Sequence, residues 1–420
     1  MSRLTVDSTD AMQTLTETPE GVRHRDAFVM TLAQALHLFG TPAHRLEQAM
    51  SAVARDLDMQ MQILATPTSV TLAIGALDNQ RTFLMRVEPS SINLAKLADL
   101  HTVMEQVCSG TMELPQGKQN IDAIVSRASR YPRWLHAMAF AVSSACATVL
   151  FGGHLVDAAF AATIGLLVGI LAILSSGRLR LATLVPAVGA AVAAILARTA
   201  AHYWPDLHPL VITLAALIVL LPGLSLTMGV NELAHQHLVS GTARLMGAFV
   251  VLLQLGLGVA AGWGVANILW GASATLAIES PGIALLVTAV LGAAIAFTIL
   301  FNAAPRDFIS VLSGAAVAYA AARWGTAQFG PEFGAAFGAW SMGCLANLLA
   351  RLRNKPALIT ILPGIILLVP GAMGFLSVQA IMSDEIGAGM QTGATTIMVA
   401  IALVVGLFLS NFTISPRKLL

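Results

Sequence analysis

Long apolar segments, separated by short polar turns, occupy the chain from Trp134 to about residue 414. A segment of about 20 apolar residues is long enough to cross the hydrocarbon core of a membrane as an α-helix. The chain of 420 residues is 56% hydrophobic and 11% charged, whereas soluble proteins carry roughly 25% charged residues. The sequence therefore predicts a polytopic α-helical membrane protein. The net charge of +1 argues against a nucleic-acid partner.

The lengths of the apolar segments predict ten spans. These lie near residues 134–152, 155–175, 181–201, 209–230, 245–268, 281–301, 304–324, 333–350, 357–382 and 386–414. Lys and Arg cluster in alternate connections, which the positive-inside rule places in the cytoplasm. The cytoplasmic set is Arg127, Arg130, Arg133, Arg178, Arg180, Arg244, Arg306, Arg351, Arg353, Lys355, Arg417 and Lys418. An even number of spans with both termini in the cytoplasm satisfies this rule.

Two proline-glycine pairs interrupt apolar spans at matching places in the two halves of this region. The offset of 148 that takes Gly223 to Gly371 also takes Pro222 to Pro370 and Gly241 to Gly389. The same offset superimposes residues 134–268, the first repeat with five spans, on residues 282–416, which cover the second repeat predicted over 281–414. Copies with an odd number of spans lie in opposite orientations, so we expect two inverted five-helix repeats, a pattern of secondary transporters.

A proline within a helix removes a backbone donor and costs about 3 kcal/mol or more. In a membrane such a break persists where protein or a polar cavity meets the freed groups. The half-helix after the break presents N–H groups to an anion such as a carboxylate. A packed kink is the alternative, and it is our interpretation of the unmatched Pro363-Gly364. The predicted substrate-binding residues are Pro222, Gly223, Ser225, Asn231, Pro370 and Gly371.

Three carboxylates at span ends are candidates for proton coupling. Glu232 ends the fourth span, where compensation of the helix dipole fails, so a functional role is favoured. Asp157 and Asp307 open spans, where dipole compensation explains them equally well. No Cys/His cluster, Walker motif or hydrolase motif occurs in the sequence, so we expect neither an enzyme nor a bound cofactor or metal.

The polar N-terminal portion predicts a small cytosolic α+β domain. We expect a disordered tail over residues 1–25, the domain over 26–110, and a linker over 111–133 that contains an interfacial helix. Within the domain, helical periods from Asp26 and from Pro42 precede three short strands near residues 61–64, 69–75 and 82–87. A third helix is expected from Ser91 to Cys108.

The order of several motifs resembles the threonine/serine exporter family. These motifs are FGTPAHRLEQAM (39–50), TPTSV (66–70), LFGGHLVDAAFAATIGLLVG (150–169), PGLSLTMGVNELAHQHLVSGTARL (222–245) and LLVPGAMGF (367–375). The resemblance implies an exporter of small hydroxylated amino acids in a bacterial inner membrane, driven by the proton motive force. Its expected partners are substrate, protons and lipid; a homo-oligomer is left open.

Two alternatives remain beside this function. Relatives of this family that are split into two chains are similar to dicarboxylate exporters, so export of a succinate-like dicarboxylate is the first alternative. The second belongs to another class, a membrane-anchored sensor in which the soluble domain acts and the spans anchor it.

Overall fold

The computed structural model describes residues 19–87, 92–271, 281–353, 355–368, 371–383 and 385–415. The chain divides into two compact units, one reaching Ala128 and the other beginning at Ser129. The division lies within the predicted linker, a few residues before the first apolar span. Most of the predicted N-terminal tail lies outside the described residues.

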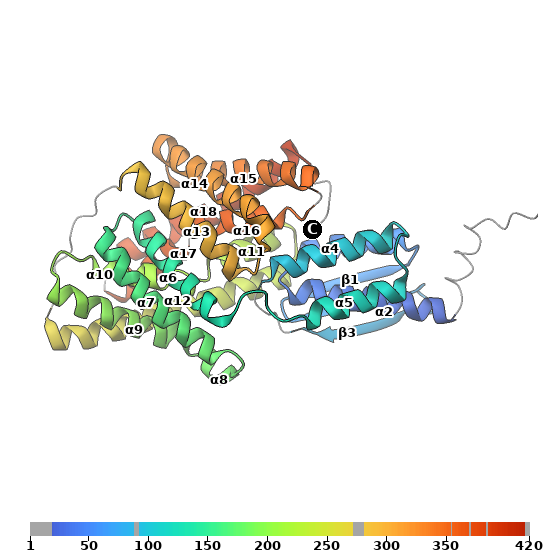
Figure 1. The fold of residues 1–420 in the computed structure, drawn as a ribbon, viewed down its shortest axis with the longest axis horizontal. Coiled ribbons are helices and arrows are strands. Elements are labelled where there is room, and N and C mark those ends of the chain that lie inside the picture. The colour runs from blue at the N-terminus through green and yellow to red at the C-terminus, as the bar shows by residue number, and fades with distance from the viewer. Residues whose placement is uncertain are drawn as a thin grey trace, which may run out of the picture. The chain divides into compact units, whose positions relative to one another are not determined.

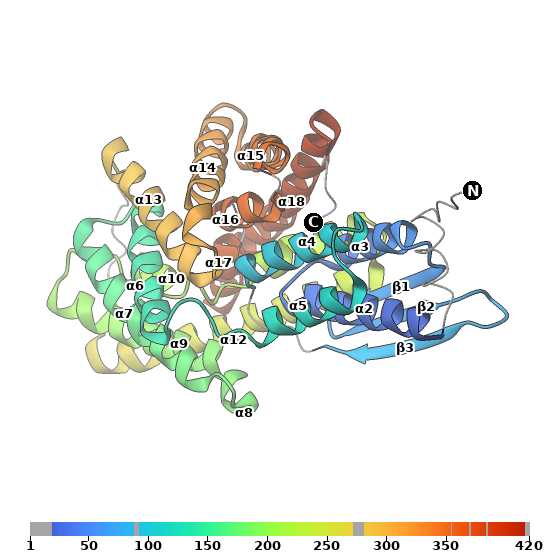
Figure 2. The ribbon, with the colours of Figure 1, turned by 45° about the vertical axis from the view of Figure 1, so that its right-hand side comes forward.

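The N-terminal unit is an α+β domain with one antiparallel sheet. Its strands follow the order β1-β2-β3, in which each strand pairs with the next along the chain. Helix α3 contacts β1 and helix α2 contacts β2 (Figure 2). The elements are α2 (Pro19–Leu38), α3 (Ala43–Asp56), β1 (Met61–Thr66), β2 (Ser69–Ile74), β3 (Arg81–Arg86), α4 (Leu94–Cys108) and α5 (Leu114–Ser126).

Two helix starts in this unit differ from the predicted ones. Helix α2 begins at Pro19, so the prediction of a disordered tail up to residue 25 is wrong from Pro19 onward. Helix α4 is capped by Asn93, whose side chain accepts a hydrogen bond of 3.0 Å from the backbone nitrogen of Lys96. The predicted cap, Ser91, lies outside the described residues.

Helix α5 covers the segment that was predicted to lie on a membrane surface. It contacts α2 and α4, and its apolar residues Ile121 and Ile124 are buried. The ammonium of Lys96 donates hydrogen bonds to the carbonyls of Val125 and Arg127 at the end of α5, at 3.0 and 2.7 Å. The prediction of an interfacial helix is therefore wrong. An apolar stripe on a helix shows that one face of the helix is buried. It does not show whether that face packs against protein or lies in lipid.

The second unit is an all-helical bundle (Figure 1) in which every predicted span corresponds to a helix or to a broken pair of helices. The first half contains α6 (Arg133–Leu150), α7 (Leu155–Ser175), α8 (Leu179–Ala182), α9 (Val185–Tyr203), α10 (Pro209–Ala216), α11 (Gly223–Ala234) and α12 (Leu238–Trp270). The second half contains α13 (Ile283–Leu300), η1 (Pro305–Asp307), α14 (Phe308–Phe329), α15 (Pro331–Arg353), α16 (Leu358–Leu368), α17 (Gly371–Met382) and α18 (Ile386–Thr413).

Within the described residues, 7 helical segments are long and apolar enough to cross a membrane by themselves. They are α7, α9, α12, α13, α15, the segment Leu358–Met382 and α18. The break between α10 and α11 leaves two helices that are each too short to qualify. Helices α6 and α14 carry polar residues, including Arg133 and Arg323. A polytopic helical membrane protein is thus confirmed, and the number of ten crossings stays a prediction.

Helix bounds in the two halves follow the offset found in the sequence. Helix α11 (Gly223–Ala234) falls on α17 (Gly371–Met382) at both ends, and the start of α12 at Leu238 falls on the start of α18 at Ile386. The predicted repeat thus has matching helices after each break. Their opposite orientation in a bilayer remains a prediction.

Candidate functional site

The first proline-glycine pair separates two helices inside the bundle. Helix α10 ends at Ala216, turns occupy residues 217–221, and α11 begins at Gly223 with Pro222 as its N-cap. Gly223 is buried, and Ser225 in the first turn is partly exposed. The prediction of a broken helix at this place is confirmed. Because the first turn of a helix has no intrahelical partners for its N–H groups, the break supplies backbone donors inside the bundle.

Thr227 adds a side-chain donor to the first break. It lies about one turn after Gly223 and is 1% exposed, and its hydroxyl has no hydrogen-bond partner among the described residues. A buried polar atom left unsatisfied costs about 1–3 kcal/mol, so a ligand that bonds to this hydroxyl would gain that free energy. The sequence analysis missed Thr227. The sequence feature that points to Thr227 is a hydroxyl residue about one helical turn after Pro222-Gly223.

The second proline-glycine pair lies at the equivalent place of the other half. Helix α16 ends at Leu368 and α17 begins at the buried Gly371; Pro370 lies outside the described residues. The unmatched Pro363-Gly364 lies inside α16 and is buried. A Cβ atom on Gly364 would lie 2.1 Å from the sulfur of Met342 and 2.9 Å from the carbonyl of Gly314. Close packing therefore accounts for this pair, as the sequence analysis expected.

The helices that follow the two proline-glycine pairs, α11 and α17, each contact helices of the opposite half. Helix α11 contacts α18 and α17, and α17 contacts α12. Leu224, in the first turn of α11, packs against the core of the second half. Its counterpart at the offset of 148, Ala372, packs against the core of the first half, which also includes Phe375 and Val378 of α17. Helices α11 and α17 therefore each pack against the half to which they do not belong.

Glu232 lies at the far end of α11, about 14 Å along the helix from the first break. Its side chain is fully buried. Its oxygens accept hydrogen bonds from Nε of Arg244 at 3.0 and 2.9 Å, and the hydroxyl of Ser240 donates to it at 2.7 Å. Both partners lie on α12, so this cluster joins α11 to α12 around the turn at residues 235–237. Asn231 precedes it and is partly exposed.

Asp157 joins two helices of the first half. Its carboxylate is 1% exposed and accepts hydrogen bonds from the backbone nitrogens of His154 and His208, each at 2.9 Å. The Nδ1 atom of the buried His208 lies 3.0 Å from Oδ2 of Asp157, and the ring of His154 lies 5.3 Å from the ring of His208. His208 precedes α10, so this contact connects the start of α7 to the start of the broken span.

Asp307 makes the corresponding contact in the second half. It is 1% exposed, precedes α14, and forms an ion pair with the ammonium of Lys355. Lys355 lies just before α16, the first helix of the other broken span. In each half a buried aspartate at the start of the second long helix thus holds a basic residue at the start of the broken span. The basic residue is a histidine in one half and a lysine in the other.

Sequence reasoning found all three carboxylates and none of their basic partners. The partners are His208, Arg244 and Lys355, which lie 51, 12 and 48 residues away from their aspartate or glutamate. The available signal was topological, because each base ends a loop on the same predicted side of the membrane as its acid. The spacing between acid and base along the chain does not indicate this pairing.

In the N-terminal unit the buried Asp26 of α2 forms an ion pair with Arg81 of β3 at 2.5 Å. Burial, together with the neighbouring Asp56 carboxylate, raises the pKa of the Cys108 thiol to about 12, so it is not a nucleophile near neutral pH. No group of three or more His, Cys, Asp or Glu side chains that could hold a metal ion occurs among the residues the structure describes.

Comparisons with known proteins agree with a membrane exporter. Residues 27–266 match a family described as "Putative threonine/serine exporter", and residues 286–413 match one described as "Threonine/Serine exporter, ThrE". No solved structure matches the chain.

Similar curated proteins come from yeasts and are each called Pheromone-regulated membrane protein 10. The protein from Saccharomyces cerevisiae is 27% identical over 442 residues, covering 99% of this chain and 56% of its own length. The one from Kluyveromyces lactis is 27% identical, covering 99% of this chain and 45% of its own length. The one from Candida albicans is 28% identical and covers 99% and 39%. The chain thus spans about half the length of these relatives, or less.

Proposed function

Because the chain belongs to the putative threonine/serine exporter family, we propose that it is a secondary active exporter of threonine and serine that works by alternating access. The observation that carries this proposal is the break between α10 and α11, together with the contacts that α11 and α17 make with helices of the opposite half. Discontinuous helices at a repeat interface are where secondary transporters bind their substrates.

The substrate site of this proposal is built around the breaks. The first turns of α11 and α17, at Gly223 and Gly371, offer backbone N–H groups to the carboxylate of the amino acid. This proposal includes Pro222 and Pro370, which precede the two glycines in the sequence, and Ser225, Thr227 and Asn231, which lie on α11. The buried, unpartnered hydroxyl of Thr227 suits the hydroxyl group that threonine and serine share.

Alternating access requires two related halves with opposite orientation in the membrane. The reciprocal packing of Leu224 and Ala372 supports this, because a two-fold relation exchanges the partners of equivalent residues. We propose ten crossings with both termini in the cytoplasm. The placement in a bacterial plasma membrane is part of the proposal and draws on the sequence resemblance, since the relatives named above come from yeasts.

Proton coupling is assigned in this proposal to Asp157 together with His208. Histidine is the side chain whose charge changes between about pH 5 and 8, and the two groups share a direct contact of 3.0 Å. In the proposed topology both lie at the outer ends of their helices, where protons enter. Asp307 pairs instead with a lysine, and Glu232 pairs with an arginine.

Flux from vesicles that contain the purified protein tests this function. Vesicles are loaded with labelled threonine, serine or succinate, and efflux is followed with and without an inward proton gradient. We expect efflux of threonine and serine that the gradient accelerates and that protein-free vesicles lack.

Other outcomes select the alternatives. Efflux of succinate alone assigns a dicarboxylate exporter. Absence of flux for all three substrates from well-folded protein rejects transport of these molecules and favours a membrane-anchored sensor.

A further inference from the structure

Residues 129–136, where the chain enters the helical unit, are fastened to one turn of the second half. This turn joins α13 to α14. The hydroxyl of Ser129 donates to Oδ1 of Asn302 at 2.6 Å, and the hydroxyl of Tyr131 donates to the carbonyl of Ala303 at 2.8 Å. The bonded residues lie 173 and 172 positions apart in the chain. The two bonds therefore hold the beginning of the first repeat against the second repeat.

His136, in the first turn of α6, adds a third contact with the same turn. Its Nε2 atom lies 3.5 Å from Nδ2 of Asn302, and its Nδ1 atom lies 3.3 Å from the carbonyl of Pro132. Because a carbonyl can only accept a hydrogen bond, Nδ1 carries the proton and Nε2 accepts from the amide of Asn302. The side chain of Asn302 thus accepts one bond and donates another, and both go to residues 129–136.

Asn302 has a backbone conformation that favours glycine. Its φ is +49°, and its backbone nitrogen bonds to the carbonyl three residues before it. The turn after α6 has the same pattern, but there the residue is Gly152, with a φ of +87°. A side chain at such a φ costs conformational energy that glycine avoids. The asparagine of the second half is therefore explained by what its amide binds, and Gly152 has no side chain with which to make the same contact.

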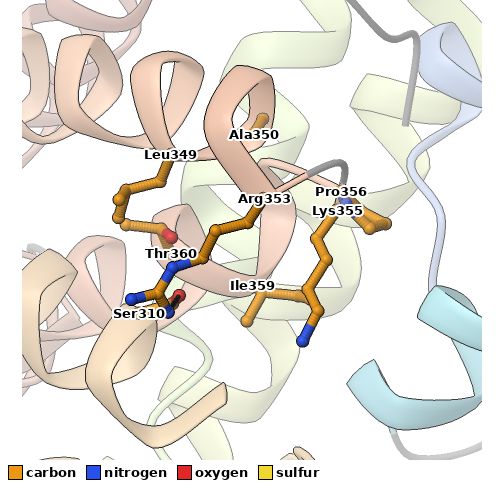
Figure 3. A pocket seen from close by; sticks show the side chains of 8 residues that line it. All are labelled: Ser310, Leu349, Ala350, Arg353, Lys355, Pro356, Ile359 and Thr360. Atoms are coloured by element: carbon orange, nitrogen blue, oxygen red, sulfur yellow. Dashed lines mark hydrogen bonds between the residues drawn. The ribbon is translucent and has the colours of Figure 1, made fainter. Parts of the chain in front are cut away.

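The turn that contains Asn302 leads directly into the start of α14. There Asp307 forms its ion pair with Lys355, and Nη1 of Arg353 lies 3.2 Å from the hydroxyl of Ser310. Figure 3 shows Arg353 reaching toward Ser310, with Lys355 on the other side of the same small pocket. The start of α14 is thus fastened on one side to residues 129–136 and on the other to the connection that begins the second broken span.

Arg127, two residues before Ser129, is held within the N-terminal unit. Its guanidinium pairs with Asp99 at 2.8 Å, and its carbonyl accepts a hydrogen bond from the ammonium of Lys96 at 2.7 Å. Ala128 alone separates Arg127 from Ser129 in the chain. Because this leaves little free chain to absorb a displacement, a movement at the end of α5 is transmitted to Ser129.

We propose that residues 129–136 form a latch, which closes the inner end of the second repeat through Asn302 and opens when that repeat moves. The proposal rests on the proposed export function for the need of this movement. The closed latch holds α6, the turn at Asn302 and the start of α14 in one arrangement. Opening breaks the bonds to Asn302 and Ala303 and frees the start of α14. Through Arg127, the N-terminal unit can favour one of the two states.

Hydrogen exchange of the purified full chain in detergent, measured by mass spectrometry, tests whether Asn302 holds the latch. Asn302→Gly removes the side chain and keeps a residue that suits the positive φ. We expect exchange in residues 129–136 to become about tenfold faster or more, the change expected for loss of two neutral hydrogen bonds. The midpoint of thermal unfolding should stay close to that of the parent.

Ser129→Ala should change exchange in the same direction by a smaller factor, because it removes one of these bonds. Ser126→Ala is the matched control. The exposed hydroxyl of Ser126 bonds within its own helix, to the carbonyl of Ala123, so this variant should exchange as the parent does in residues 129–136.

A disulfide across the latch tests whether it must open. The side chains of Ser129 and Asn302 meet at 2.6 Å, so the double variant Ser129→Cys with Asn302→Cys should form a disulfide on oxidation. The native Cys108, Cys146 and Cys344 are replaced by Ala. In vesicles we expect oxidation to stop threonine efflux and a reductant to restore it. Oxidation should leave efflux by each single variant unchanged.

Two results would overturn the proposal. Equal exchange in residues 129–136 of Asn302→Gly and the parent would show that Asn302 does not hold this segment. Efflux of the oxidised double variant at the rate of its reduced form would show that the latch need not open. Hydrogen exchange requires no transport, so a failure of the export function and a failure of the latch are distinguishable.

Discussion

At the scale of single residues, the contact between His208 and Asp157 distinguishes the two ends of the proposed transport path. The Asp157 contact contains a histidine, and the Asp307 contact contains a lysine. The two halves thus place similar pairs at equivalent positions and give them different chemistry.

We therefore expect His208→Gln to flatten the pH dependence of threonine efflux between about pH 5.5 and 8, because the titrating partner of Asp157 is lost. The matched control is His202→Gln, since His202 lies in the last turn of α9, is exposed, and its ring stacks on that of Trp270 with the centroids 4.4 Å apart. The pH dependence of both variants is measured as threonine efflux at a series of external pH values. A His208→Gln profile that coincides with the parent would move the proton to another group.

The cluster around Glu232 predicts a loss of stability when one partner is removed. Glu232→Gln leaves the Arg244 guanidinium, 19% exposed, without its carboxylate, and a buried group left unsatisfied costs about 1–3 kcal/mol. We expect a lower midpoint of thermal unfolding in detergent. The double variant Glu232→Gln with Arg244→Gln should lose less than the sum of the single losses.

A different result would restore Glu232 as the proton carrier. In that case Glu232→Gln would unfold at the parent's temperature, abolish uphill efflux and leave counterflow exchange intact. The structure favours a clamp between α11 and α12, since both carboxylate oxygens already accept hydrogen bonds.

At the scale of helices, the proposed binding site depends on the two proline-glycine pairs, Pro222-Gly223 and Pro370-Gly371. Replacing Pro222-Gly223 or Pro370-Gly371 by Ala-Ala lets the backbone continue as a helix and satisfies its N–H groups internally. A carboxylate then loses charge-assisted hydrogen bonds of about 1.5–3 kcal/mol each, so we expect apparent affinity for threonine to fall about tenfold or more. The apparent affinity is obtained from efflux measured over a range of threonine concentrations.

Pro363→Ala is the control for this pair of variants. Pro363 also lies in a helix of a broken span, but it packs inside α16 away from the break. It should leave the apparent affinity for threonine close to that of the parent. Two Ala-Ala variants that fold normally and keep the parent's affinity would show that the breaks are kinks for packing.

Close approaches between long helices also occur at equivalent places in the two halves. A Cβ atom on Gly258 of α12 would lie 2.2 Å from the carbonyl of Ala187 on α9. Its counterpart Gly406 of α18 would meet the carbonyl of Ala336 on α15 at the same distance. Each contact brings the backbones of two helices together, so an added side-chain atom cannot be accommodated by a change of side-chain rotamer.

We expect Gly258→Ala and Gly406→Ala to destabilise the protein by similar amounts, about 1–3 kcal/mol each, because an added methyl group forces the helices apart. Gly264→Ala, on the same helix as Gly258 and with open space around it, should be neutral or slightly stabilising. Thermal unfolding in detergent compares the three. A loss at Gly264 as large as at Gly258 would contradict the packing argument.

At the scale of the whole molecule, the membrane topology decides whether a contact lies at the outer face or at the cytoplasmic face. In the proposed arrangement of ten spans, the Asp157–His208 contact lies at the outer face and the Asp307–Lys355 contact at the cytoplasmic face. The described helices agree with every predicted span in position, including the broken ones. Composition and length alone identify fewer spans, because α10 and α11 are short and because α6 and α14 carry polar residues.

Cysteines placed at Asp206 and Glu332 should react with a membrane-impermeant maleimide added outside intact cells. Cysteines placed at Arg178 and Arg353 should react only after the membrane is made permeable. Each is introduced singly into a variant without native cysteines, and unaltered expression serves as the control. Labelling of the Arg353 position from outside would exclude the ten-span arrangement.

The sequence by itself determined the positions of helices, strands and breaks in this protein. Apolar length, the period of two in the strands near residues 61–87, and the punctuation by Pro222-Gly223 are local signals. Backbone geometry responds to them locally, so the spans and the meander follow from the sequence. The offset that relates Gly223 to Gly371 is likewise a property of the sequence alone.

The tertiary structure alone decided the partners. Asp157, Glu232 and Asp307 could be singled out as ionisable groups near a membrane, but their roles depend on His208, Arg244 and Lys355. The same holds for α5, whose apolar stripe meets α2 and α4 rather than lipid. Contacts between residues far apart in the chain depend on how whole helices pack, and packing is set by the shape and volume of many side chains together. No single spacing in the sequence carries that information.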